Sequence, residues 1–253
     1  MKRAAICIIG IAALALNAFA ARDDLVGLWR FDGNGDTALD SSGNGNDAEF
    51  VKGGERVDTD WGMGVQLAAA EGSYILAPVP HSNTVTYVIW AKYSSLPSNN
   101  PGLLHAQATD ADEGAPATKI IGIWVESSNT LWGRIIPPGG GTINLPKNKK
   151  LEADTWFHVA MVIDADAGKA IQYVNGEEVG SADYNGELGP YKFLKIGRQG
   201  TETWEGVLDE VGFFHSALSE DEIASIHGSG FDALLSVEPN GKLAAAWAEL
   251  KTQ

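Results

Sequence analysis

The chain has 253 residues, of which 33 are acidic and 18 are lysine or arginine, so its formal net charge is −15. Such a charge argues against nucleic acid or an anionic membrane surface as the partner, because both attract basic proteins. It is compatible with solubility and with the binding of divalent cations, although a solvated acidic surface explains most of it.

Residues 1–20 have the pattern of a secretory signal peptide. Lys2 and Arg3 precede an apolar run at 4–16 that is short for a bilayer span, and residues 18–20 fit an A-x-A cleavage site. Cleavage after Ala20 leaves 233 of the 253 residues, removes the single cysteine, Cys7, and takes the net charge from −15 to −17. An uncleaved membrane anchor is the alternative. No later apolar run predicts a membrane span, so we expect a secreted, cell-surface or periplasmic protein.

The first half of the mature chain predicts short strands separated by turns. A strand at 25–31 is followed by a loop at 32–47 that is rich in Gly, Asn, Asp and Ser. Further strands are predicted at 48–51, 65–67, 73–77, 85–92 and 102–106. The strand at 85–92 carries bulky residues on both faces, which indicates a central position in a sheet.

The second half predicts more strands and then a helix. A hairpin is expected from 119–126 and 130–136, and a second central strand at 156–163. Asn175-Gly176 separates strands at 170–174 and 177–181 and favours a type I′ turn, which needs positive φ at both positions. Strands at 193–197 and 206–214 follow. Ser219 and Glu222 form a capping box that predicts a helix start, and residues 243–250 have helical spacing.

Many short strands, with helix only near the end, predict an all-β antiparallel sandwich. Four motifs then show a resemblance: LVGLWRFD at 25–32, DSSGNGNDA at 40–48, TWFHVAMVID with YVNGEEV at 155–179, and GVLDEVGFF with ALSxxEI at 206–223. In this order they resemble the laminin-G-like, concanavalin A-like jelly rolls of bacterial secreted proteins. The resemblance implies a two-sheet jelly roll at 21–228, after the signal peptide at 1–20 and before a C-terminal helical extension at 229–253.

A calcium site is the first functional hypothesis. Asp209 and Glu210 lie in the middle of an apolar strand, where alternation would point one carboxylate inward, and a buried carboxylate needs a partner. The loop at 32–47 is rich in the oxygen ligands that calcium prefers. The family resemblance places a structural calcium near this loop and the Asp-Glu pair, which implies Asp32, Asn46 and Asp209 as ligands. The alternative is that the loop residues only form Asx turns.

A carbohydrate-binding face is the second hypothesis. Sugars stack on exposed aromatic rings, and four aromatic residues in or beside predicted loops are candidates: Trp61, Trp132, Tyr184 and Trp204. Packing at the edge of the core is the alternative for each. Trp29, Trp90 and Trp156 fall in predicted strands and are interpreted as packing residues.

We predict no catalytic residues. Some enzymes of this fold use Glu-x-Asp-x-x-Glu on one strand, but here Glu205 is followed two positions later by Val207, and no catalytic Ser/His/Asp order stands out. The leading interpretation is a secreted, non-catalytic module that recognises a polysaccharide or glycoprotein surface and holds a structural calcium. A structural or adhesive surface protein with a protein partner is the alternative, and a glycoside hydrolase or lyase is less favoured.

Overall fold

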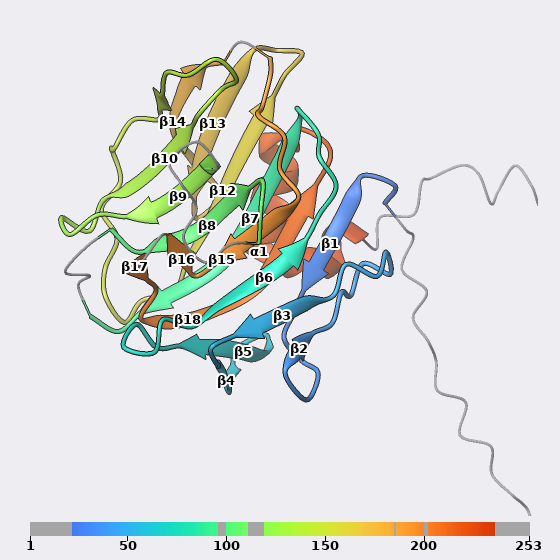
Figure 1. The fold of residues 1–253 in the computed structure, drawn as a ribbon, viewed down its shortest axis with the longest axis vertical. Coiled ribbons are helices and arrows are strands. Elements are labelled where there is room, and N and C mark those ends of the chain that lie inside the picture. The colour runs from blue at the N-terminus through green and yellow to red at the C-terminus, as the bar shows by residue number, and fades with distance from the viewer. Residues whose placement is uncertain (1–21, 96–99, 111–118, 185, 200–201, 236–253) are drawn as a thin grey trace, which may run out of the picture.

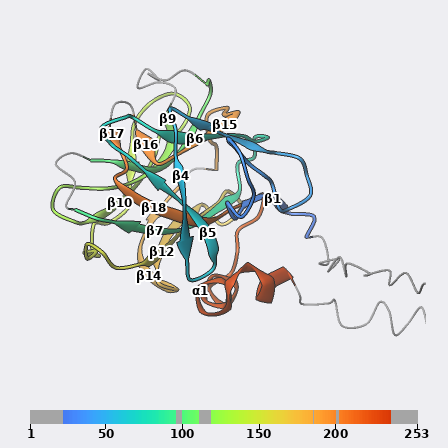
Figure 2. The same ribbon diagram turned by 90° about the horizontal axis from the view of Figure 1, so that it is seen from below.

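The structure, a computed structural model, describes residues 22–95, 100–110, 119–184, 186–199 and 202–235. The predicted signal peptide and the predicted helix at 243–250 lie outside the described residues. Two large antiparallel sheets are stacked, and one helix lies against the outside of one of them (Figures 1 and 2). The predicted all-β sandwich is therefore confirmed.

The first sheet, called sheet A, supports the helix. β18 (Gly206–Phe214) lies near its middle and also pairs with β1 (Leu25–Trp29). The other strands follow in the order β14 (Glu177–Asp183), β13 (Lys169–Val174), β12 (Phe157–Asp164), β7 (Val85–Tyr93), β18 (Gly206–Phe214), β5 (Gly62–Leu67) and β4 (Glu55–Thr59).

The second sheet, sheet B, closes the other side of the core. Its strands run in the order β11 (Ile143–Asn144), β10 (Leu131–Ile135), β9 (Lys119–Val125), β8 (Gly102–Gln107), β15 (Phe193–Ile196), β6 (Tyr74–Pro78), β3 (Ala48–Val51) and β2 (Thr37–Ala38). A short ribbon of β16 (Arg198–Gln199) and β17 (Glu202–Thr203) stands apart from both sheets.

The core lies between the two sheets. Tyr87 and Ile89 of β7 meet Leu194 and Ile196 of β15 in one cluster of fully buried side chains. The intervening residue Val88 belongs to a second cluster, under the helix on the outer face of sheet A. β7 is therefore buried on both faces, as its sequence predicts. The Asn175-Gly176 turn is also confirmed, since both residues have positive φ.

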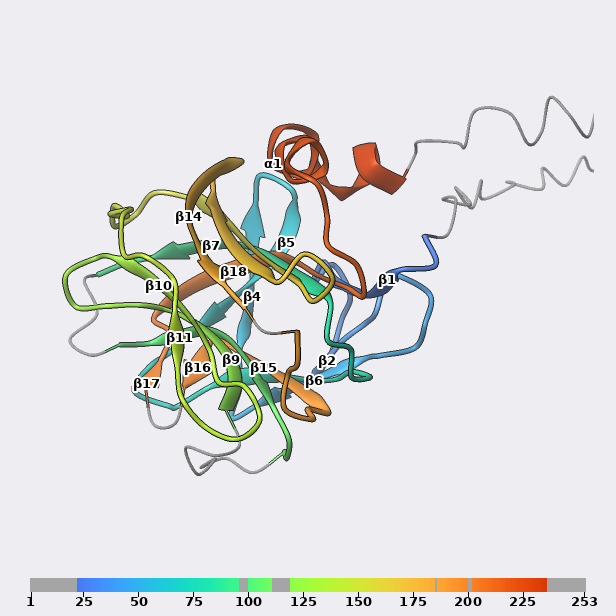
Figure 3. The same ribbon diagram turned by 90° about the horizontal axis from the view of Figure 1, so that it is seen from above.

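The helix α1 (Glu220–Leu235) covers part of the outer face of sheet A (Figures 2 and 3). Its predicted capping box is present, because the Glu222 amide donates to Ser219 Oγ at 3.3 Å and the Ser219 amide donates to Glu222 Oε2 at 2.8 Å. The predicted domain boundary after residue 228 lies close to a kink in α1 at Gly230, whose φ of 74° and ψ of 178° are not helical. Phe231, beyond that boundary, stacks on Phe214 of β18. Among the described residues, no helix combines the length and apolar character needed to cross a membrane.

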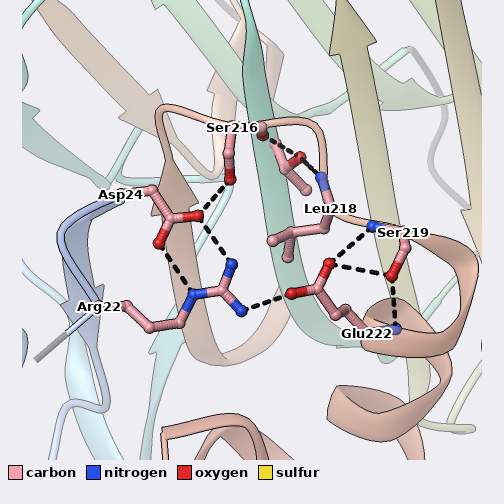
Figure 4. A network of polar contacts seen from close by, with 7 residues as sticks. Arg22, Asp24, Ser216, Leu218, Ser219 and Glu222 are labelled. Carbon is pink, nitrogen blue, oxygen red and sulfur yellow. Dashed lines mark hydrogen bonds and ion pairs between the residues drawn. The ribbon is translucent and has the colours of Figure 1, made fainter. Parts of the chain in front are cut away.

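Arg22 connects the start of the described chain to α1 (Figure 4). Its guanidinium group forms two hydrogen bonds to Asp24, at 2.8 and 2.7 Å, and one to Glu222 at 2.6 Å. Asp24 also accepts a hydrogen bond from Ser216, in the connection between β18 and α1. The hydrogen bonds from Arg22 are the main cause that lowers the pKa of Asp24. The entry to β1 and the first turn of α1 are thus held together.

The sequence missed three edge strands, the two-residue strands β2 and β11 of sheet B and the longer β4 of sheet A. β4 pairs with β5 in a hairpin, although its sequence, ERVDT, is polar and half-exposed, and β5 begins at Gly62, before the strand predicted at 65–67. Charged residues on an edge strand are common because they discourage pairing with other chains. Such a strand lacks the alternation of apolar residues on which prediction depends.

We predict that Phe231→Ala destabilises the domain by about 3 kcal/mol. The ring is 1% exposed, and it fills the space above Gly212, where an added Cβ would lie 2.4 Å from a ring carbon. Chemical denaturation of the variant would measure the loss, with the exposed Ser229→Ala as the matched control. A loss below 1 kcal/mol for Phe231→Ala would show that α1 does not pack here.

Candidate functional site

The acid couplet, Asp209 and Glu210, lies at a β-bulge in β18. Asp209 pairs with Trp90 of β7 and Gly212 pairs with Val88, so β18 has one residue more than β7 between these pairs. Glu210 has φ 45°, which is uncommon for a residue other than glycine. The core-facing residues Leu208 and Val211 flank the couplet. Both acids therefore lie on the outer face of sheet A, which corrects the prediction that they point to opposite faces.

The couplet is buried and has little counter-charge. Asp209 accepts hydrogen bonds from the Thr59 hydroxyl at 2.6 Å and from the Glu210 amide at 2.7 Å. Arg30 Nη1 lies 3.7 Å from Glu210 Oε1, but Arg30 also pairs with Asp232 of α1. Burial raises the pKa of Asp209 to about 6 and that of Glu210 to about 7. Ionising both acids is therefore costly unless a cation compensates.

Asp32 reaches the couplet from the N-terminal loop. Asp32 Oδ1 accepts a hydrogen bond from the Met63 amide at 2.8 Å, and its negative charge helps to raise the pKa of Asp209. Gly62 allows this approach, because an added Cβ there would lie 2.3 Å from Asp32 Oδ1. The loop after β1 and the closing strand β18 thus meet, as the calcium hypothesis requires.

Asn46 has a different role in the structure. Its side-chain amide donates to the Val26 carbonyl at 2.8 Å, and its backbone carbonyl accepts from Trp29 Nε1 at 2.9 Å. Within the part of the chain that the structure describes, no hydrogen bond joins it to Asp32 or Asp209. Of the three predicted calcium ligands, Asp32 and Asp209 therefore affect each other through their charges, whereas Asn46 has its partners in β1.

Asp40 organises the loop that contains Asn46. Its carboxylate accepts hydrogen bonds from the backbone amides of Leu28, Ser42 and Asn46, at 3.0, 2.9 and 2.9 Å. These contacts match the alternative interpretation, in which the loop residues form Asx turns. Among the described residues, no group of three or more His, Cys, Asp or Glu side chains is arranged to hold a metal ion. Calcium binding stays a prediction.

Three tryptophans form a cluster on the same face of sheet A. The ring of Trp61, from the β4–β5 turn, lies 4.4 Å from the ring of Trp90 and 5.1 Å from that of Trp156 between centroids. His227 of α1 stacks on Trp90 at 5.4 Å. Trp90 is buried, as its strand position predicts, whereas Trp61 and Trp156 are partly exposed.

A cleft of about 240 Å³ lies beside Trp156. Lys92 Nζ is 5.1 Å from the centroid of the Trp156 ring. Asn175 is held by two hydrogen bonds with the backbone of His158, at 2.9 and 2.8 Å. The cleft therefore offers the partly exposed Trp156 ring and the buried Phe157 together with amide, hydroxyl and charged groups. It is lined by Lys149, Lys150, Leu151, Glu152, Thr155, Trp156, Phe157, Val174 and Asn175.

The four aromatic residues predicted to bind a ligand do not converge. Trp61 belongs to the tryptophan cluster on sheet A, whereas Trp132 lies on β10 of sheet B and packs against Trp124. Trp204 and Tyr184 are 0% and 4% exposed and belong to the core, which corrects the expectation that their rings lie at the surface. Sequence reasoning missed Trp156, because a tryptophan beside a strand motif was interpreted as packing.

The comparisons with known proteins agree with this fold. Residues 67–224 match a family model described as the concanavalin A-like lectin/glucanases superfamily. A search of curated protein sequences gave no match.

Solved structures of similar fold include the binding domain of Paraclostridial Mosquitocidal Protein 1, at 18% identity and a TM-score of 0.64, covering 83% of this chain and 53% of that chain. This chain thus spans about half the length of that structure. Another is domain 4 of AbnA, a GH43 extracellular arabinanase from Geobacillus stearothermophilus in complex with arabinotriose, at 20% identity, a TM-score of 0.63, and 81% and 98% coverage. A third is Trypanosoma rangeli sialidase in complex with the inhibitor DANA, at 20% identity, a TM-score of 0.61, and 80% and 32% coverage.

At these identities the structural likeness shows the fold alone. The family model, however, matches well over half of the chain and includes Trp90, Trp156 and the acid couplet on β18, although not Trp61. The chain belongs to the concanavalin A-like lectin/glucanases superfamily.

Proposed function

We propose that this domain is a non-catalytic recognition module that binds a polysaccharide or a glycosylated surface in the cleft beside Trp156. The observation that carries the proposal is a partly exposed tryptophan ring at the wall of a cleft with several polar groups. A sugar can stack its C–H face on such a ring while Asn175 and Thr155 hydrogen-bond its hydroxyl groups. The similar fold of the AbnA domain, which was solved with arabinotriose, supports the proposal.

The lining of the cleft favours binding over hydrolysis. Glycosidases of the common types need two carboxyl groups on either side of the scissile bond. Glu152 is the single acidic residue that lines the cleft. Asp209 and Glu210 are engaged with Thr59 and Arg30 and do not line it.

We also propose export through the N-terminal apolar segment, which supports a function at the cell surface or beyond it. A protein partner remains the competing proposal, and it would be favoured if no carbohydrate binds. Calcium is proposed as a structural ion near Asp32 and Asp209. The support is that burial and the charge of Asp32 raise the pKa of Asp209 and Glu210, while Arg30 is the one cation that forms an ion pair with this couplet in the described part of the chain.

The first prediction for the proposed function concerns Trp156→Ala. Removing the ring should weaken binding to any polysaccharide that a glycan array identifies by roughly thirtyfold, which corresponds to about 2 kcal/mol for a central tryptophan. Titration calorimetry measures the change. Trp132→Ala, on sheet B, is the matched control and should keep full affinity. If Trp132→Ala weakened binding and Trp156→Ala did not, the binding site would lie on sheet B.

The second prediction concerns pH in the absence of divalent cations. Because the pKa values of Asp209 and Glu210 are raised in the folded protein, the folded state binds more protons than the unfolded state between about pH 4 and 7. Stability should therefore fall as the pH rises through this window, by on the order of 3 kcal/mol. Denaturation in EDTA at pH 5 and pH 8 measures the fall, which a double variant, Asp209→Asn with Glu210→Gln, should largely remove.

The third prediction separates calcium from protonation. Millimolar calcium should raise the Tm of the chelated protein at pH 8 more than at pH 5, because ionised carboxylates bind the ion. Asp209→Asn should abolish the rise, whereas Asp58→Asn, an exposed acid on β4, should keep it. An unchanged Tm with calcium at pH 8 would remove the calcium proposal and leave the carbohydrate site untouched.

A further inference from the structure

The cleft beside Trp156 concentrates lysines on an acidic protein. Lys149 and Lys150 line the cleft, and Lys92 lies against the Trp156 ring. The chain as a whole has 33 acidic residues and 18 lysines and arginines, so an average patch of its surface is negative. The local excess of positive charge therefore marks this cleft as different from the rest of the surface.

These lysines also differ in their partners from the lysines and the arginine that form ion pairs elsewhere on the domain. Lys147 pairs with Glu126, Lys169 pairs with Asp183 at 2.6 Å, and Arg22 pairs with Asp24 at 2.7 Å. In the described ranges, by contrast, no carboxylate forms an ion pair with Lys149, Lys150 or Lys92. Glu152 is the single acid in the lining, so the charges around the cleft do not cancel.

The backbone that carries two of the lysines is fixed. The Lys149 carbonyl accepts a hydrogen bond from the Leu131 amide at 3.1 Å, and Lys150 forms a β-bridge with Thr130. The next residue, Leu151, is 6% exposed and donates to the Asn129 carbonyl at 2.8 Å. The segment therefore presents its lysines from a rigid edge of the sandwich, which lowers the entropy cost of binding a ligand between them.

We propose that the cleft recognises an acidic sugar within a polysaccharide. The sugar ring stacks on Trp156, and its negatively charged group lies beside Lys149 and Lys150, which line the cleft. Glu152 and Asn175 accept hydrogen bonds from its hydroxyl groups. This inference rests on the proposed carbohydrate-binding function and adds the charge of the ligand to it. The chemistry admits a carboxylate, as in a uronic acid, or a sulfate.

The test compares charged polysaccharides with neutral forms of the same backbone. Polygalacturonate and alginate are measured beside their carboxyl-reduced forms, and dextran sulfate beside dextran, all with the full-length mature protein. At least one acidic polymer should bind about tenfold more tightly than its neutral form, and the difference should shrink as salt is raised. Comparing the preference for the two uronate polymers with the preference for dextran sulfate identifies whether a carboxylate or a sulfate is recognised.

The double variant Lys149→Gln/Lys150→Gln should lower affinity for the acidic polymer to that of the neutral form. Lys169→Gln, which removes an exposed charge on β13, is the control and should keep the preference. Equal affinity for charged and neutral forms, or an unchanged preference in the double variant, would overturn the inference. If a neutral glycan binds and Trp156→Ala abolishes it, the proposed function survives that result; if no carbohydrate of either kind binds, the proposed function fails as well.

Discussion

The bulge at Asp209 and Glu210 is the constraint on which the outer face of sheet A depends. β18 pairs with β7, β5 and β1. An extra residue in β18 therefore changes which of its side chains lie beside those three strands. The core-facing residues Leu208 and Val211 keep their places, and both acids are turned to the helix side. A positive φ at Glu210 is the conformational cost of this arrangement.

The helix side of sheet A is consequently divided into an apolar and a polar region. Phe231 of α1 packs on Phe214, and together with Val88 they form an apolar patch under the helix. Further along β7, Trp90 lies opposite Asp209 and stacks with His227, where α1 meets the tryptophan cluster. The helix thus covers the apolar patch, and the cleft beside Trp156 lies at the start of β12 and the end of β13.

Sequence patterns predicted the parts of this fold that depend on local periodicity. β7 and β12 were identifiable because apolar residues occupy both faces, and α1 because Ser219 and Glu222 cap it. The bulge was not predictable, because register depends on the partner strand and not on β18 alone. For the same reason the exposure of single rings was misjudged: Trp204 is enclosed by Tyr93 and Phe157, which are distant in sequence.

The acid couplet and the cleft are joined by a short series of contacts. The Thr59 hydroxyl donates to Asp209 and accepts from the Trp61 amide at 3.2 Å, so one side chain holds both the acid and the β4–β5 turn. That turn places the Trp61 ring edge-on against Trp156, at the wall of the cleft. Asp209 therefore acts on the aromatic surface through Thr59, by fixing the position of Trp61. One buried acid of the couplet thus has a structural role: it holds the turn from which Trp61 reaches the other two rings of the tryptophan cluster.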